Sequence, residues 1–169
     1  MIRALLFLLL LPLQAAAQDI DAAPFRDRFA ACLAQADSAE ALRSCKDVVA
    51  DACQSESEGG QSTLGITTCY QIEAALWDEA LNADWPGHMA RAKASDDAYG
   101  DRQNGVFARY AETLLAAQRA WIAWRDAECS LSYASWGDGS MRNIAASTCM
   151  AHLTADRVIR LREMTGAFR

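Results

Sequence analysis

The sequence predicts an all-α protein, an antiparallel helical bundle whose hairpins are stapled by disulfides. Three observations support this fold class. Apolar residues recur at steps of three or four, the period of an amphipathic helix, and clear strand alternation is absent. Of the three prolines, only Pro86 lies inside the body of the chain. The six cysteines fall into consecutive pairs around turn signals.

The cysteines are placed symmetrically about the predicted turns. The pairs are Cys32 with Cys45, Cys53 with Cys69, and Cys129 with Cys149. Their midpoints fall directly beside the turn signal Asp37–Ser38, within Gly59–Ser62 and at Gly139. Two cysteines equidistant from a turn face each other when the flanking arms fold back, at the Cα separation of roughly 4.4–6.8 Å that a disulfide needs. The symmetry therefore favours three local disulfides, the alternative being six unrelated thiols.

Residues 1–17 predict a signal peptide. Met1–Arg3 is a short basic start, Ala4–Leu13 is almost wholly apolar, and Ala15–Ala17 supplies the small residues of a cleavage site. The apolar run is shorter than the roughly 20 residues that a membrane-spanning helix needs. We expect cleavage near Ala17 and a periplasmic or secreted mature protein, in an oxidising compartment that supports disulfides.

The charge balance is acidic. The chain has 22 acidic and 16 basic residues, a net charge of −6. Cleavage after residue 17 removes Arg3 and no acidic residue, so the mature chain has a net charge of about −7. Such a protein is a poor candidate for nucleic acid or an anionic membrane, and we expect neither nucleic-acid binding nor membrane insertion. A basic protein is a reasonable partner.

The mature chain is expected to begin with a small appendage. Residues 18–52 predict a short N-terminal helical hairpin, which starts at about Phe25 and has Ser38 as the N-cap of its second arm. Residues 53–169 form the predicted main helical domain. Its first segment, Gln54–Gly65, is expected to be a polar, glycine-rich loop.

Three long helices are expected in the main domain. The first begins near Thr67 or Thr68. The expected ranges are about 67–99, 106–133 and 141–164, with a loop at 100–105 and a glycine-rich turn at 137–140. Pro86 is expected to kink or interrupt the first of these helices, because proline lacks an N–H and clashes with the preceding turn.

Polar side chains interrupt the apolar stripes of these helices. The predicted buried polar network comprises Glu73, Gln118, Arg125, Asp126 and Arg157. Because an unpaired buried charge is costly, we expect Arg125 to meet Glu73, and Arg157 to meet Asp126 or Asp78. The network either fixes the helix register or lines a binding cleft. The structural interpretation is favoured, because paired polar groups in a bundle need no ligand.

The turn between the last two helices is the first candidate binding loop. Trp136, Asp138 and Ser140 are its candidate partner-binding residues. Trp136 either covers the end of the hairpin or anchors a partner. A disulfide at the base of the turn would reduce the entropy lost on binding. The loop Gln54–Gly65 is the second candidate.

Catalytic and cofactor motifs are missing from the sequence. It contains no G-x-S-x-G elbow, no phosphate-binding glycine loop and no C-x-x-C redox pair. The two histidines, His88 and His152, stand in no metal-ligand motif. We expect no cofactor, no metal site and no enzyme activity, with an unrecognised hydrolase as the minority alternative.

A series of motifs runs from about Cys53 to Met164. It consists of C-x-x-x-E at 69–73, W-D at 77–78, L-N at 81–82, A-Q-x-x-W-x-x-x-R-D-x-x-C at 117–129, and Cys149 followed by L-T-x-x-R-x-x-x-L at 153–161. This series resembles the LprI-like lysozyme-inhibitor family of exported bacterial proteins. The resemblance implies a small helical, disulfide-bonded envelope domain that inhibits lysozyme-type muramidases.

Two functions are consistent with these features. The first is an exported, non-enzymatic inhibitor, which its acidic charge would steer toward a basic lysozyme. The second is a periplasmic binding or scaffold module for another envelope protein or a peptidoglycan fragment. That module would use a concave face containing Trp85, Trp124 and the region of Glu73 and Arg125.

Overall fold

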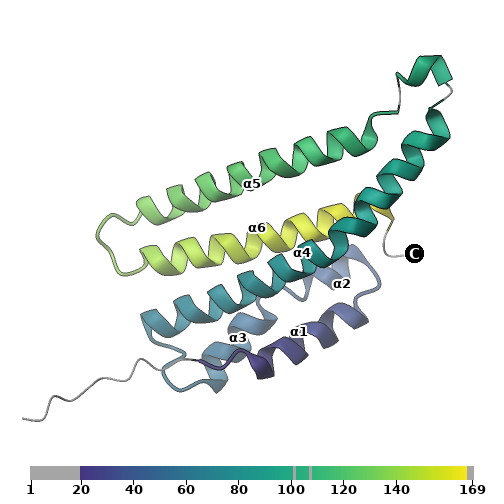
Figure 1. Ribbon diagram of the computed structural model, residues 1–169. Coiled ribbons are helices and arrows are strands. Elements are labelled where there is room, and N and C mark those ends of the chain that lie inside the picture. Colours follow the sequence, from purple (N-terminus) through teal and green to yellow (C-terminus); the bar gives the residue numbers. More distant parts are fainter. Residues whose placement is uncertain (1–19, 101, 107, 167–169) are drawn as a thin grey trace, which may run out of the picture.

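The computed structural model describes residues 20–100, 102–106 and 108–166 (Figure 1). The predicted signal peptide and its cleavage site lie outside these ranges. The regular elements of the described residues are all helical, which confirms the predicted fold class. They are α1 (Ala23–Gln35), α2 (Ala39–Arg43), α3 (Val48–Glu56), α4 (Thr63–Tyr99), the 3-10 helix η1 (Arg102–Gly105), α5 (Tyr110–Ala134) and α6 (Arg142–Thr165).

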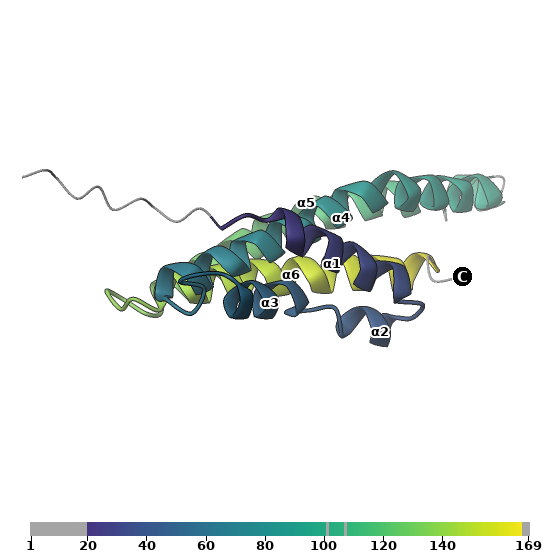
Figure 2. The same ribbon diagram turned by 90° about the horizontal axis from the view of Figure 1, so that it is seen from below.

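The three long helices form an elongated bundle. In Figure 1, α6 runs between α4 and α5, and the last turns of α4 and the first turns of α5 extend beyond it at the right. The short helices α1–α3 cover α4 and α6 on the side away from α5 (Figures 1 and 2). One hydrophobic core joins the short helices to the three long helices. Its buried cluster includes Phe29, Leu42, Trp77, Leu114 and Leu161. The division of the chain at residues 52 and 53 falls within α3 and stays a prediction.

Three disulfides fasten neighbouring segments together. They are Cys32–Cys45, Cys53–Cys69 and Cys129–Cys149, with Cα–Cα distances of 5.9, 5.5 and 5.4 Å. These are the pairs that the symmetry about the turns predicts. The first ties α1 to the segment after α2, the second ties α3 to α4, and the third ties α5 to α6.

The N-terminal segment has three helices where a two-armed hairpin was expected. Ser38 caps α2 as predicted, since its hydroxyl accepts a hydrogen bond from the N–H of Ala41 at 3.2 Å. The predicted second arm is broken by Asp47, whose φ of 68° is left-handed. Aspartate tolerates this conformation better than most residues, and a helix cannot continue through it.

The helix α4 begins earlier than predicted and passes through Pro86. Its start is set by Ser62, whose hydroxyl accepts from the N–H of Gly65 at 3.0 Å, so the preceding loop is shorter than Gln54–Gly65. Of the two effects expected of Pro86, an interruption does not occur, because α4 continues to Tyr99; a kink at this residue stays a prediction. Pro86 and Asn82, whose carbonyl loses its intrahelical donor, are both exposed. Water can therefore satisfy that carbonyl at little cost.

Candidate functional site

The structure divides the predicted polar network into three separate clusters. The first surrounds Glu73 of α4, which is fully buried. Its carboxylate accepts hydrogen bonds from the backbone N–H of Asp47 at 2.7 Å, the N–H of Ala50 at 2.8 Å and the indole N–H of Trp77 at 3.2 Å. The predicted pairing of Glu73 with Arg125 is therefore wrong, because Glu73 faces α3.

Glu73 acts as the N-terminal cap of α3 from another helix. The Asp47 side chain at the N-cap position makes no capping hydrogen bond, so Glu73 satisfies N–H groups that the first turn leaves free. Its negative charge also lies at the positive end of the helix dipole. Burial raises the pKa of the Glu73 carboxyl, and the hydrogen bonds from Ala50 and Asp47 offset this only in part.

The second cluster is a bridge made by Arg125 of α5. Its guanidinium lies 2.9 Å from the Asp126 carboxylate, 3.6 Å from the carboxylate of Asp78 on α4, and 3.4 Å from the hydroxyl of Thr154 on α6. It also lies over the ring of Trp121, 5.0 Å from the centroid. The Arg125 side chain is 12% exposed, whereas its two carboxylate partners are 50% and 56% exposed. We name this cluster the Arg125 bridge, because it joins the three long helices.

The third cluster pairs Arg157 with Gln118. The Arg157 Nε donates to the amide oxygen of Gln118 at 2.8 Å, and its guanidinium lies 5.5 Å from the centroid of the Trp121 ring. The prediction that Arg157 pairs with Asp126 or Asp78 is wrong, because both carboxylates turn to Arg125. Gln118 is buried, so the bond satisfies a polar group inside the bundle.

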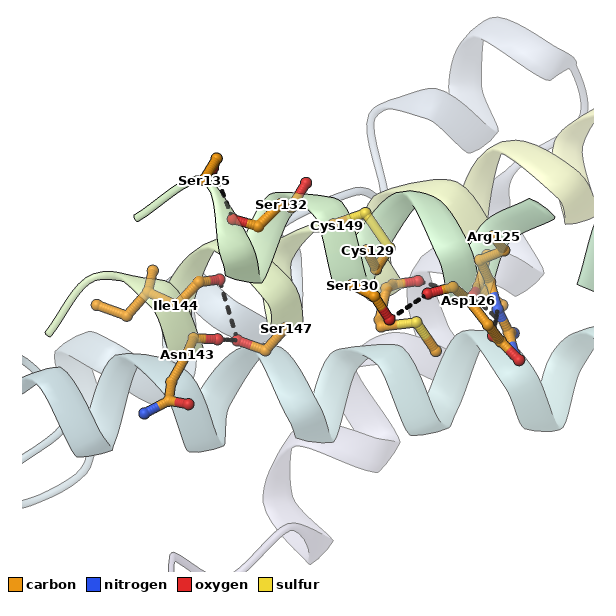
Figure 3. Close-up of a disulfide and its surroundings, with 12 residues drawn as sticks. Arg125, Asp126, Cys129, Ser130, Ser132, Ser135, Asn143, Ile144, Ser147 and Cys149 are labelled. Carbon is orange, nitrogen blue, oxygen red and sulfur yellow. Dashed lines mark hydrogen bonds and ion pairs between the residues drawn. A yellow bond between two sulfur atoms is a disulfide. The ribbon is translucent and has the colours of Figure 1, made fainter. Parts of the chain in front are cut away.

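Two hollows adjoin each other beside the α5–α6 disulfide. Ala146 and Met150 of α6 line both of them. The hollow toward α5, of about 420 Å³, is also lined by Asp126, Cys129, Ser130 and Tyr133. The hollow toward α4, of about 320 Å³, is also lined by Thr67, Gln71, Ala74, Asn143 and Ser147. We call the two together the α4–α5 groove; Figure 3 shows several of its residues around the disulfide.

The candidate binding loops lie at one end of the bundle. The turn between α5 and α6 carries Trp136, which is 49% exposed, and the exposed residues Asp138 and Ser140. The loop between α3 and α4 is at the same end, at the left of Figure 1. The disulfide Cys129–Cys149 joins the two helices that carry the turn (Figure 3).

The concave face suggested for a binding module does not form. Glu73 is sealed under α3 and Trp85 packs against the core, while Trp124 is 50% exposed. Arg125 does not join Glu73 in a shared surface. The structure thus separates residues that the sequence analysis placed in one cleft.

Several contributors to these clusters were missed from the sequence. Trp77 stands four residues after Glu73, a spacing that could have indicated their contact. Asp47 offered no such signal, because its role depends on a left-handed turn; its side chain also lies 2.7 Å from His152 Nε2. Ala146 and Met150 share one helix face, a pattern that does not distinguish a groove from a core.

The described residues hold no group of three or more His, Cys, Asp or Glu side chains that could bind a metal ion. Within the same ranges, none of the helices is both long and apolar enough to cross a membrane. The features that are present define a class: a helical protein fastened by disulfides, with a groove and an exposed turn at one end of the bundle.

Comparison with known proteins shows the family to which the chain belongs. A model of the family described as "Lysozyme inhibitor LprI" matches residues 53–161, well over half of the chain, and the chain belongs to this family. Membership and the three disulfides indicate an extracellular or periplasmic protein.

The chain is also similar to Uncharacterized protein R02472 from Rhizobium meliloti (strain 1021). The two are 29% identical over 143 residues, which cover 85% of this chain and 94% of the relative. This similarity extends beyond the segment that the family model matches. No solved structure matches the chain.

Proposed function

We propose that this protein is a non-enzymatic inhibitor of a lysozyme-type muramidase, exported by its signal peptide to the periplasm or beyond the cell. The observation that carries the proposal is the family match over residues 53–161. The net charge of −6 supports a basic enzyme as the partner, because opposite charges steer two proteins together.

We place the primary contact at the turn that contains Trp136, Asp138 and Ser140. A half-exposed tryptophan is a typical anchor of a protein interface, since it buries a large area with few rotatable bonds. The Cys129–Cys149 disulfide at the base of the turn limits its motion, which lowers the entropy cost of binding.

The proposal is tested by the rate at which a basic lysozyme lyses peptidoglycan, with and without the oxidised mature protein. We expect stoichiometric inhibition that weakens from low to physiological salt. Trp136→Ala is expected to raise the inhibitor concentration for half-inhibition at least about tenfold. Trp124→Ala is the matched control, because Trp124 is equally exposed but belongs to helix α5 and not to the turn.

Two results would contradict the proposal. Absence of inhibition across the classes of lysozyme would remove the function and favour the envelope-binding or scaffold module. Inhibition that Trp136→Ala and Trp124→Ala leave equally intact would keep the function and remove the turn as its main contact.

A further inference from the structure

The α4–α5 groove runs between the candidate turn and the Arg125 bridge. Tyr133 lines the groove three residues before Trp136, so the groove extends to the neighbourhood of the turn. At the far end, the Arg125 bridge crosses from α5 to Asp78, one helical turn beyond the lining residue Ala74. The groove therefore has an inner end at the Arg125 bridge, a floor on α6 and an outer end near the turn.

Three of the four hydroxyl groups that line the groove turn their protons away from it; the fourth belongs to Tyr133. Thr67 donates to the carbonyl of Thr63 at 2.7 Å, and Ser130 donates to the carbonyl of Asp126 at 2.7 Å. Ser147 donates to the carbonyls of Asn143 and Ile144, as Figure 3 shows. Because each hydroxyl has one proton, these three oxygens offer an occupant of the groove only lone pairs.

The inner end of the groove is negatively charged, whereas the guanidinium of Arg142 lies at the outer end, 5.3 Å from the centroid of the Tyr133 ring. Asp126 is the single charged side chain among the residues that line the two hollows. Its Oδ1 accepts from Arg125, while no protein donor contacts its Oδ2 among the hydrogen bonds of the described residues. The inner end holds two half-exposed carboxylates, Asp78 and Asp126, against the one guanidinium of Arg125.

The amide groups of Gln71 and Asn143 and the hydroxyl of Tyr133, which can donate, line other parts of the groove. At the inner end, the Asp126 carboxylate beside the apolar side chains of Ala146 and Met150 matches an occupant that carries a cation on an apolar stem.

We propose that the α4–α5 groove receives a lysine or arginine, together with an adjoining apolar side chain, from a basic loop of the inhibited lysozyme. The ammonium or guanidinium lies against Asp126 Oδ2 at the inner end, and the apolar part covers Ala146 and Met150. The aliphatic stems of lysine and arginine suit such a floor. This inference rests on the proposed function and adds a second contact to the turn.

Two pairs of variants test the groove by calorimetric titration with a basic lysozyme, alongside the lysis assay. Ala146→Arg fills the groove and adds a positive charge, whereas Ala127→Arg makes the same change at an exposed alanine outside the groove lining. We expect Ala146→Arg to weaken binding at least about thirtyfold relative to Ala127→Arg. Circular dichroism and the melting temperature identify a variant that fails to fold.

The second pair compares two carboxylates on one helix. Asp126→Asn and Glu128→Gln change the net charge equally, but only Asp126 lines the groove. We expect Asp126→Asn to weaken binding about threefold to tenfold more than Glu128→Gln, and to reduce its salt dependence. This pair keeps the proposal testable if Ala146→Arg does not fold, because the side-chain volume barely changes.

The outcomes separate the groove from the proposed function. If the wild type inhibits, and both members of each pair bind equally, the groove proposal is wrong while the inhibitor function stands. If the wild type binds no lysozyme, both fall. Binding of soluble peptidoglycan fragments in place of the enzyme, lost in Ala146→Arg, would also overturn the basic-loop proposal and assign the groove to a saccharide.

Discussion

Glu73 and Arg125 are both charged residues on otherwise apolar helix stripes, yet their surroundings differ. Glu73 is fully buried and is satisfied by backbone and indole N–H groups, and its hydrogen-bond partners among the described residues include no cation. Arg125 is nearly buried, but its carboxylate partners are half exposed and stand at the end of an open groove. The first charge holds a helix start in place, and the second joins three helices beside a surface that a partner can reach.

The comparison teaches that a charged residue on an apolar helix stripe can be either fully buried or close to the surface, depending on the partners it needs. A carboxylate can be stabilised by the free N–H groups of a helix start, so it can be sealed inside. A guanidinium has five donors and needs carboxylates or carbonyls, which favours a position near the surface. The two sites should therefore respond differently to substitution.

Glu73→Ala is expected to give the largest effect. It leaves the N–H groups of Asp47 and Ala50 and the Trp77 indole without their acceptor, at a cost of about 3–5 kcal/mol in the free energy of unfolding. Urea denaturation of the oxidised protein measures this cost. Glu79→Ala is the control, since Glu79 makes only an exposed pair with Arg26 and should leave the midpoint nearly unchanged. Equal midpoints for the two variants would refute the capping role of Glu73.

Replacing Cys129 and Cys149 together by alanine should have the next largest effect. Removing this cross-link frees a loop of 20 residues' separation in the unfolded state, which lowers the free energy of unfolding by about 3 kcal/mol. The melting temperature of the variant and of the wild type measures the loss. We also expect weaker inhibition, because the disulfide holds the helices on which the turn and the groove depend. An unchanged melting temperature would argue against this pairing.

Arg125→Ala is expected to cost less than Glu73→Ala. A loss of a few kcal/mol would be expected if a buried partner were left unpaired. The structure lowers this expectation to about 1–2 kcal/mol, because Asp78 and Asp126 are half exposed and water can solvate them, while the stacking on Trp121 is lost. Urea denaturation of Arg125→Ala and Glu73→Ala in parallel compares their losses in the free energy of unfolding. If both variants lost the same free energy of unfolding, the expected difference between the two sites would be wrong.

The smallest expected effect is a pH dependence at His88. This buried residue of α4 has its Nδ1 2.9 Å from the Thr165 hydroxyl. Burial lowers the pKa of its imidazole; the charge of Asp84 opposes this shift and nearby arginines add to it. The unfolded state therefore takes up a proton at a higher pH than the folded state. Stability present above pH 6.5, the ordinary value of histidine, is lost as the pH falls below it.

The variant His88→Gln tests this dependence, because glutamine stays neutral and can still bond to Thr165. Between pH 6.5 and 5.5 we expect the wild type to lose up to about 1 kcal/mol more than the variant. Denaturant titrations at several pH values measure the difference. Parallel curves would show that His88 titrates alike in the folded and unfolded states.

Local patterns in the sequence determined the helices and the cysteine pairs. The period of the apolar residues, Ser38 as an N-cap and the symmetry of cysteines about turns all concern residues close together in the chain. Helices and short-range disulfides depend on such neighbours, so a single sequence carries enough information to predict them. The family motifs are equally local and pointed to the family that residues 53–161 match.

Only the tertiary structure decided which charges meet and where the surface is hollow. Glu73 accepts a hydrogen bond from the N–H of Asp47, a residue in a left-handed turn 26 positions earlier in the chain. Arg125 pairs with Asp78 and Asp126, the two carboxylates that the sequence also offered as partners of Arg157. Ala146 and Met150 became the floor of a groove because α4 and α5 leave that face of α6 partly uncovered. These outcomes depend on how three long helices are placed and rotated relative to each other. The periodicity of each helix shows which face is apolar, but not which residues of another helix that face meets.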